Sequence, residues 1–295
     1  MEYHWISRRG GRLSNVLRQE MGLSTGLMNR LKWQGGLLVN GSSVHTDYPV
    51  TPGDRVTILL DEETPAYPAE DVPLNVLYED DFLLAVDKPQ GMLIHPSSVR
   101  NTGTLANAVA GYYRKTGTPA AFHPLTRLDR DTFGAVLLAK NSFACARLQG
   151  LHPRKTYHAL TLGAPPQDAG TVDAPIARKE LPSLLREIRP DGKPSVTEYR
   201  VLRRGEKTAL LALTPVTGRT HQLRLHCAYL GFPIVGDPQY GGEAAVALGA
   251  ALGVTGQQLC AKQILFPHPV LPLLWIIYRN SPGYFRFFLE KILAK

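Results

Sequence analysis

One acidic residue stands out because of its neighbours. Asp129 lies between Arg127 and Arg130, just before the continuous apolar run of residues 135–139. Nearby positive charge favours the ionised form of a carboxyl group, so we expect a carboxylate at this position. A carboxylate held against a buried strand can act as a nucleophile or as a general base. The same pattern also suits a structural ion pair, and the local residues alone leave both interpretations open.

A second segment places polar side chains at the expected start of a helix. Residues 217–224 read Thr-Gly-Arg-Thr-His-Gln-Leu-Arg. Thr220 is a good N-cap, which predicts a helix over residues 221–230. The free amides at such a helix start favour a phosphate or a carboxylate, and Arg219 just outside the cap can reach either. A capped core helix with solvated Arg219 and His221 fits the same spacing.

Other segments carry weaker signals. Residues 87–96 form a turn-rich loop that contains His95, and on their own they predict an ordinary loop. Residues 155–160 begin an expected strand with Lys155 and Tyr157, where an aromatic residue is typical of half-buried packing. The segments 236–241 and 259–269 predict turns and a core strand, so we expect structural roles for them.

The elements that must position these residues divide into two bodies and a linker. Residues 1–60 predict two short helices and a hairpin, with Ser24 as a helix cap and Asn40-Gly41 as the turn. Residues 61–81 contain eight acidic residues, three prolines and no Lys or Arg, which predicts an extended linker. In residues 82–295 we expect strands over 82–86, 135–140, 157–162, 196–202 and 209–213, and helices over 105–113, 221–230 and 284–293. Helices inserted between neighbouring strands predict an α+β fold with a largely antiparallel sheet.

The composition narrows the class of partner. The chain of 295 residues carries a formal net charge of +8, which favours a polyanion such as nucleic acid. An anionic membrane is the weaker alternative, because no apolar stretch approaches the ~20 residues of a span. The N-terminus lacks the pattern of a signal peptide. The three widely spaced cysteines predict neither a disulfide nor a metal site, so we expect a reduced, cytoplasmic protein.

The order of the motif residues resembles the RluA-type RNA pseudouridine synthases over most of the chain. Arg-Leu-Asp-x-x-Thr-x-Gly over residues 127–134, followed by an apolar strand, matches the signature that holds the catalytic Asp of that family. The segment 217–224 matches a second family motif, whose Arg pairs with the catalytic Asp, and we assign that role to Arg219. The sequence departs from the family at Thr126, where His is usual, and at Phe133, where Ser is usual.

The resemblance implies a reaction and further roles. A uridine of RNA would be isomerised to pseudouridine without a metal or another cofactor, with Asp129 acting at C1′ of the ribose, at C6 of the ring, or in glycosidic cleavage. Tyr157 would stack on the extruded base and take part in proton transfer, and Arg127 would fill the vacated space. The remaining implied substrate or RNA contacts are Leu223, His95, Arg224, His221 and Lys155.

Residues 10–60 resemble the small RNA-binding domain of the ribosomal protein S-four type. The likeness rests on Arg12-Leu13, on Gly-x-x-Val-Asn-Gly over residues 36–41 and on Gly53-Asp54, and it departs at Ser14 and at Thr25-Gly26. It implies phosphate contacts from Arg12, Arg18, Arg30 and Lys32.

The two resemblances together favour an enzyme that acts on ribosomal RNA, with transfer RNA second, and we expect the protein to be a monomer. The rival hypotheses are a non-catalytic RNA-binding assembly factor on the same fold and a hydrolase that releases free uracil.

Overall fold

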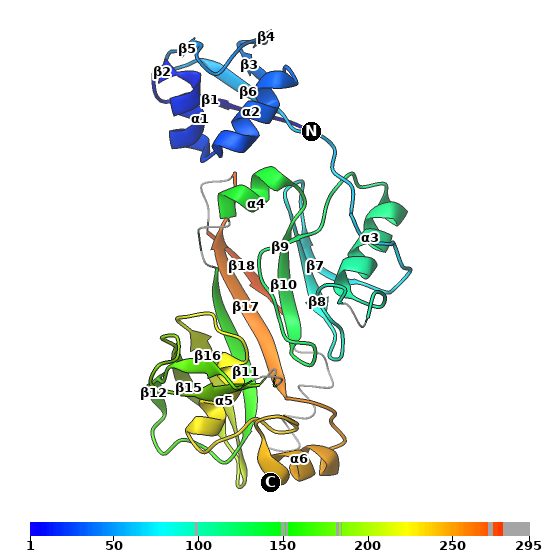
Figure 1. The fold of residues 1–295 in the computed structure, drawn as a ribbon, viewed down its shortest axis with the longest axis vertical. Coiled ribbons are helices and arrows are strands. Elements are labelled where there is room, and N and C mark those ends of the chain that lie inside the picture. The colour runs from blue at the N-terminus through cyan, green and yellow to red at the C-terminus, as the bar shows by residue number, and fades with distance from the viewer. Residues whose placement is uncertain are drawn as a thin grey trace.

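The computed structural model describes residues 1–97, 100–148, 151, 153–180, 183, 185–270 and 274–279, and Figure 1 shows their arrangement. The small body and its helices come first: β1 (Glu2–Ile6), β2 (Gly11–Arg12), α1 (Leu13–Met21), α2 (Thr25–Trp33), β3 (Leu37–Val39), β4 (Ser42–Ser43), β5 (Pro49–Val50) and β6 (Arg55–Leu59). The main body follows: β7 (Asn75–Glu79), β8 (Leu83–Lys88), α3 (Leu105–Thr116), β9 (His123–Pro124), β10 (Phe133–Ala139), α4 (Ser142–Leu148), β11 (Arg154–Leu162), β12 (Ala169–Asp173), β13 (Ile176–Arg178), β14 (Arg186–Ile188), β15 (Val196–Arg204), β16 (Thr208–Pro215), α5 (Gln222–Tyr229), α6 (Gly242–Ala251), β17 (Leu259–Pro267) and β18 (Leu274–Tyr278).

The small body, residues 1–60, packs two helices against an antiparallel sheet of order β1-β6-β3-β4. The predicted helices and hairpin are confirmed: the Ser24 side chain accepts a hydrogen bond from the Leu27 amide, and the backbone turns at Asn40 and Gly41 with positive φ angles. The apolar faces of both helices meet the inner side of the sheet in one core. Strand β1 was not predicted, because it pairs with β6 from the far end of the small body.

The main body is built on a ten-stranded sheet of order β12-β15-β16-β11-β17-β10-β8-β7, with β9 and β18 paired at its side. The predicted α+β class is confirmed, and the sheet is antiparallel except between β10 and β17. Helix α3 packs on one face of β8 and β10, α4 packs on the other face, and α5 covers β11 and β16. The predicted helix over 284–293 lies outside the described residues.

A glycine fixes the point where the two halves of the main sheet meet. Gly134 has a φ of +113°, and a Cβ atom at this position would lie 2.4 Å from the Ala261 carbonyl oxygen. Only glycine allows strand β10 to approach β17 so closely in this conformation. The loop that contains Asp129 ends immediately before this junction, so the junction sets where the loop emerges.

The segment between the bodies is bound to the main body along its length. The predicted linker over 61–81 ends earlier in the structure, because residues 75–79 form β7 and pair with β8. The Glu70 side chain accepts a hydrogen bond from the Gly103 amide, and the Asn107 side chain donates to the Pro68 carbonyl. A run of acidic residues and prolines predicts a solvated tether, but here its polar groups form hydrogen bonds with α3 and with the residue two positions before it.

A seam joins the two bodies, and we define it by Tyr3, Phe82, Phe143 and Ser142. Phe143 lies on α4 of the main body, yet it is fully buried in the core of the small body. Figure 1 shows α4 between the small body and the end of the main sheet. No described helix is long and apolar enough to cross a membrane.

Candidate active site

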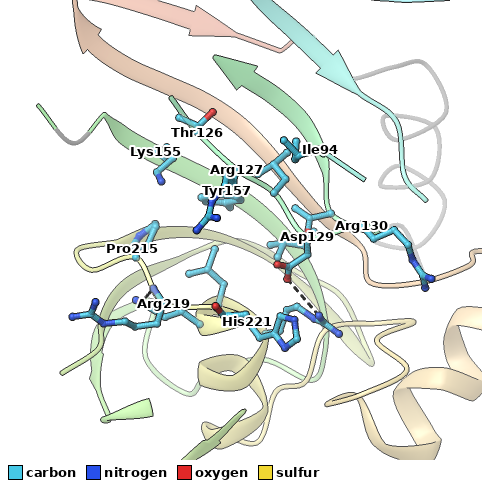
Figure 2. Close-up of a pocket in the computed structure, with 18 of the residues that line it drawn as sticks. Ile94, Thr126, Arg127, Asp129, Arg130, Lys155, Tyr157, Pro215, Arg219 and His221 are labelled. Carbon is cyan, nitrogen blue, oxygen red and sulfur yellow. Dashed lines mark hydrogen bonds and ion pairs between the residues drawn. The ribbon is translucent and has the colours of Figure 1, made fainter. Parts of the chain in front are cut away.

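A cavity of about 590 Å³ gathers the sequence motifs of the main body. Its walls come from the loop between β9 and β10, from β11, and from the segment that joins β16 to α5. Figure 2 shows these side chains converging on one space from separate segments. The cavity is lined by Asp129, Tyr157, Arg219, Arg127, Leu223, His95, Arg224, His221 and Lys155, so the structure brings together every main-body residue that the sequence singled out.

A buried lysine holds the Asp129 loop in place. The Lys88 ammonium at the end of β8 donates hydrogen bonds to the carbonyls of Pro89, Met92 and Arg130, at 2.9, 2.8 and 2.9 Å. Burial lowers the pKa of Lys88 to about 8, although the Asp131 and Asp129 carboxylates oppose this shift. Within the loop, the Thr132 amide donates to the Asp129 carbonyl at 3.2 Å. The carboxylate therefore projects from a backbone that is tied down on both sides.

The guanidinium that reaches Asp129 belongs to Arg224, and not to Arg219 as the sequence predicted. Arg224 Nη1 lies 3.4 Å from Asp129 Oδ2, and the dashed line in Figure 2 marks this contact. The Arg219 side chain points away from Asp129 in the same view, and its Nε donates to the Pro194 carbonyl at 3.2 Å. Arg219 precedes the helix and lies at the rim, whereas Arg224 lies inside α5, where its side chain reaches the cavity floor.

The start of α5 also differs from the expected one. Thr220 is not the N-cap: this position belongs to His221, which adopts a left-handed conformation with a φ of 58° and makes no side-chain cap. The Gln222 side chain instead binds the segment before the helix, because its Oε1 accepts from the Arg219 amide and from the Thr217 hydroxyl, both at 2.9 Å. Its Nε2 donates to the Val196 carbonyl, which ties the helix start to β15.

Tyr157 and Leu223 form the apolar part of the cavity. Tyr157 lies on β11 and packs with Leu223 of α5 in one hydrophobic cluster. Burial, with a smaller contribution from the Asp129 charge, raises the pKa of Tyr157. Its phenol is therefore protonated at neutral pH and can donate a proton or a hydrogen bond.

Positive charge gathers beside Tyr157, where Figure 2 shows Lys155 and Arg127 next to its ring. Arg127 is exposed, and its guanidinium has no hydrogen-bond partner among the described residues. Burial, and then the Arg127 charge, lower the pKa of Lys155 and also that of His95. Among the described residues, none of these three side chains has an ion pair with an acidic side chain, so their positive charges remain close together. Such a wall suits the phosphates of a nucleic acid.

Two residues of the site were missed by sequence reasoning. Asp237 and Tyr240 lie in the segment 236–241, for which only structural roles were expected. Asp237 is fully buried and binds Arg224 through two hydrogen bonds of 2.7 Å. The Tyr240 hydroxyl lies 2.8 Å from His221 Nδ1. The acid within the Gly-Asp-Pro turn was the available signal, but its arginine partner lies 13 residues earlier and only the fold shows the pairing.

The two departures from the family pattern have structural uses. The buried Thr126 hydroxyl accepts a hydrogen bond from the Leu137 amide at 2.9 Å, and so joins the loop to β10. The Phe133 ring lies 5.2 Å from the Arg279 guanidinium, which is itself paired with Asp87. Neither side chain blocks the carboxylate of Asp129.

The candidate RNA contacts of the small body are spread over its helices. Arg12 directly precedes α1, and Arg18 lies exposed in its last turn. Arg30 on α2 donates a hydrogen bond to the Ser142 hydroxyl at 2.8 Å, so it also contacts the seam. The Lys32 ammonium lies 5.2 Å from the centre of the exposed Trp33 ring.

Comparisons with known proteins agree with this arrangement. Residues 82–229 match the family model described as RNA pseudouridylate synthase. The "Uncharacterized RNA pseudouridine synthase YjbO" of Bacillus subtilis is 38% identical over 259 residues, which cover 85% of this chain and 89% of that protein. The "Ribosomal large subunit pseudouridine synthase C" of Vibrio cholerae is 34% identical over 277 residues, covering 88% and 86%. The solved structure of "Human RNA Pseudouridylate Synthase Domain Containing 1" aligns with a TM-score of 0.61 and 26% identity, covering 77% of this chain and 89% of that one.

Proposed function

This chain belongs to the RNA pseudouridylate synthase family, and we propose that its cavity isomerises a uridine of ribosomal RNA, with Asp129 as the catalytic residue. Members of the family are isomerases that convert uridine to pseudouridine in RNA. The observation that carries the assignment is the position of Asp129: its carboxylate faces the cavity, with Tyr157, Leu223 and Arg224 around it. The cavity volume of about 590 Å³ falls within the range of small-molecule sites, which suits one extruded nucleoside.

The reaction needs no co-reactant, because substrate and product contain the same atoms. The bond between ribose C1′ and uracil N1 breaks, the ring turns, and a bond between C1′ and C5 forms. The hydrogen on C5 leaves as a proton, and N1 gains a proton. The Asp129 carboxylate is the nucleophile that attacks C1′ or C6, or its negative charge stabilises the cleavage of the glycosidic bond.

The neighbours of Asp129 suit the handling of a flipped base. A base that leaves its stack needs another flat surface, and the Tyr157 ring lies in the cavity wall next to Leu223. The protonated phenol of Tyr157 can give a proton to the ring and take another back. Arg127, which has no protein partner among the described residues, can enter the gap that the base leaves in the RNA.

The small body would bind the RNA outside the cavity. Its two helices and sheet suit an RNA-binding domain of the S-four type, with Arg12, Arg18, Arg30 and Lys32 as phosphate contacts. Ribosomal RNA is the proposed substrate, because the Vibrio cholerae relative carries the name of a large-subunit enzyme. Arg219 at the cavity rim becomes an RNA contact in this proposal. The cytoplasmic location and the monomeric state expected from the sequence belong to the same proposal.

Mapping pseudouridines in total RNA tests the assignment. Cells with and without this protein are compared by carbodiimide-dependent stops of reverse transcription, and the deletion strain is complemented with wild type or with Asp129→Asn. We expect a ribosomal stop that wild type restores and Asp129→Asn does not, with RNA affinity changed by less than about threefold. A stop restored by Asp129→Asn would remove Asp129 from the chemistry. A growth defect repaired by Asp129→Asn, with no stop anywhere, would indicate an assembly factor, and free uracil would indicate a hydrolase.

A further inference from the structure

The structure assigns a positioning role to Asp237: we propose that it fixes the Arg224 guanidinium so that Asp129 keeps an oxygen atom free to react. This inference rests on the proposed function, because it concerns the carboxylate that carries that chemistry. It gives a role in the reaction to a residue of the turn 236–241, which lies outside the motif that contains Asp129.

The hydrogen bonds of Arg224 are divided unequally between two carboxylates. Arg224 Nε and Nη2 donate to Oδ2 and Oδ1 of Asp237, both at 2.7 Å, and Nη2 also donates to Gln239 Oε1 at 2.9 Å. Only Nη1 is directed at Asp129, at 3.4 Å. The paired bonds to Asp237 have the geometry of the strong fork between arginine and a carboxylate, whereas the contact with Asp129 is a single long one.

The two carboxylates also differ in burial. The Asp237 side chain is 1% exposed, and its Oδ1 additionally accepts hydrogen bonds from the Gln239 and Tyr240 amides at 2.9 and 3.1 Å. The Asp129 side chain is 30% exposed, and Arg224 is its only side-chain partner in the described part of the chain. Asp237 is therefore the structural partner of Arg224, and Asp129 is the accessible one.

This division has a chemical consequence. An arginine without Asp237 would turn its fork toward the remaining carboxylate and occupy both oxygens of Asp129. That pairing would reduce the electron density on both carboxylate oxygens of Asp129, and it would block the space through which an attacking oxygen reaches the substrate. With one edge held by Asp237, the guanidinium can stabilise the charge of Asp129 from one side and leave the other oxygen facing the cavity.

Asp237 supports the wall of the cavity through a second route. Its bond to the Tyr240 amide places the Tyr240 ring 5.1 Å from the Arg224 guanidinium. The Tyr240 hydroxyl accepts from the Arg186 amide at 2.9 Å and contacts His221 Nδ1. His221 holds a left-handed backbone conformation that is uncommon for residues other than glycine, which is typical of functional sites.

The test is a double-mutant cycle on kcat and KM with an RNA oligonucleotide containing the target uridine. Asp237→Asn keeps an oxygen for the turn amides but loses the charge and the paired acceptors. We expect kcat to fall on the order of 10²-fold, with KM changed by less than about threefold. In an Arg224→Lys background the fork is already gone, so Asp237→Asn should change kcat by less than about threefold. Effects that simply multiply would overturn the proposal, as would an unchanged kcat in the single variant.

Two further variants keep the result interpretable. Asp168→Asn makes the same chemical change in an exposed pair with Arg204 and should leave kcat unchanged. If Asp237→Asn does not fold, Gln239→Leu removes another acceptor from the same edge of Arg224 at an exposed position, and kcat should fall about 10-fold. An unchanged kcat in Gln239→Leu would then overturn the proposal. If wild type itself forms no pseudouridine, the proposed function fails, which is a separate outcome.

Discussion

The cavity around Asp129 and the seam between the two bodies use similar side chains in opposite ways. In the seam, the Tyr3, Phe82 and Phe143 rings pack against one another with centroids 5.8 to 6.1 Å apart. In the cavity, the Tyr157 ring forms part of the wall, and the Arg127 guanidinium is exposed and has no partner among the described residues. Side chains whose contacts are complete inside the protein stabilise it, and side chains whose contacts are incomplete are available to the RNA.

This difference predicts two classes of variant. Changes in the cavity should remove activity and leave the free energy of unfolding nearly unchanged. Changes in the seam should lower the free energy of unfolding and leave the chemistry of the folded protein intact.

The largest effect should come from the hydroxyl of Tyr157. Tyr157→Phe keeps the ring that stacks on the base and removes the proton donor, so kcat should fall about 10³-fold, or about 4 kcal/mol in the barrier. Single-turnover kinetics would measure this loss. The matched control is Tyr113→Phe on α3, which removes a buried hydroxyl that has no partner among the described residues. A Tyr157→Phe enzyme with normal kcat would limit Tyr157 to stacking.

The next effect belongs to the seam. Phe143→Ala empties a fully buried position in the core of the small body, so the free energy of unfolding should fall by about 3 kcal/mol. Urea denaturation would measure the change, and kcat per folded molecule should stay within about twofold of wild type. Leu151→Ala, at a position 51% exposed, is the control with little expected effect. A loss of kcat equal to that of a cavity variant would show that the seam and the cavity are coupled.

A smaller effect should appear as acid sensitivity of the segment beside the seam. Burial alone would raise the pKa of Glu63, but hydrogen bonds from His123 and from Ser142 lower it to about 2. Because the folded-state pKa is depressed, this group stabilises the fold above the unfolded-state pKa, and the contribution is lost as the pH falls from about 5 to 2. After a discount for partial exposure, we expect about 2 kcal/mol.

Acid titration of stability would check this contribution. The slope between pH 5 and 2, followed by urea midpoints, should be shallower in Glu63→Gln than in wild type. The reference variant is Glu62→Gln, whose exposed side chain has no hydrogen bond or ion pair among the described residues and should keep the wild-type slope. Equal slopes in wild type and Glu63→Gln would show that the pair with His123 does not stabilise the seam region.

The sequence predicted the local elements and the contents of the cavity, and it failed where long-range pairing decides. Asp129 and Tyr157 were found because motif residues border recognisable strands. Arg219 was preferred over Arg224 because the spacing of a motif does not show which side chain turns inward at a helix start. Asp237 was missed for the same reason, since its role depends on a partner brought near by the fold. The predicted end of the linker at residue 81 was wrong. The edge strand β7 forms by pairing with β8, and this pairing cannot be recognised from the residues of the segment alone.

The smallest effect concerns Arg30, which contacts the seam and is also a proposed RNA contact. One of its N–H groups donates to the Ser142 hydroxyl across the seam, and the guanidinium has further donors that can bind phosphate. Ser142→Ala should cost about 0.5 kcal/mol of stability and leave RNA affinity unchanged. Arg30→Ala should have the same small cost, and it should also lower RNA affinity about threefold and reduce the salt dependence by about one charge. Filter binding at several salt concentrations separates the two. Identical behaviour of both variants would assign Arg30 to the seam alone, because only a phosphate contact gives the arginine an effect that the serine lacks.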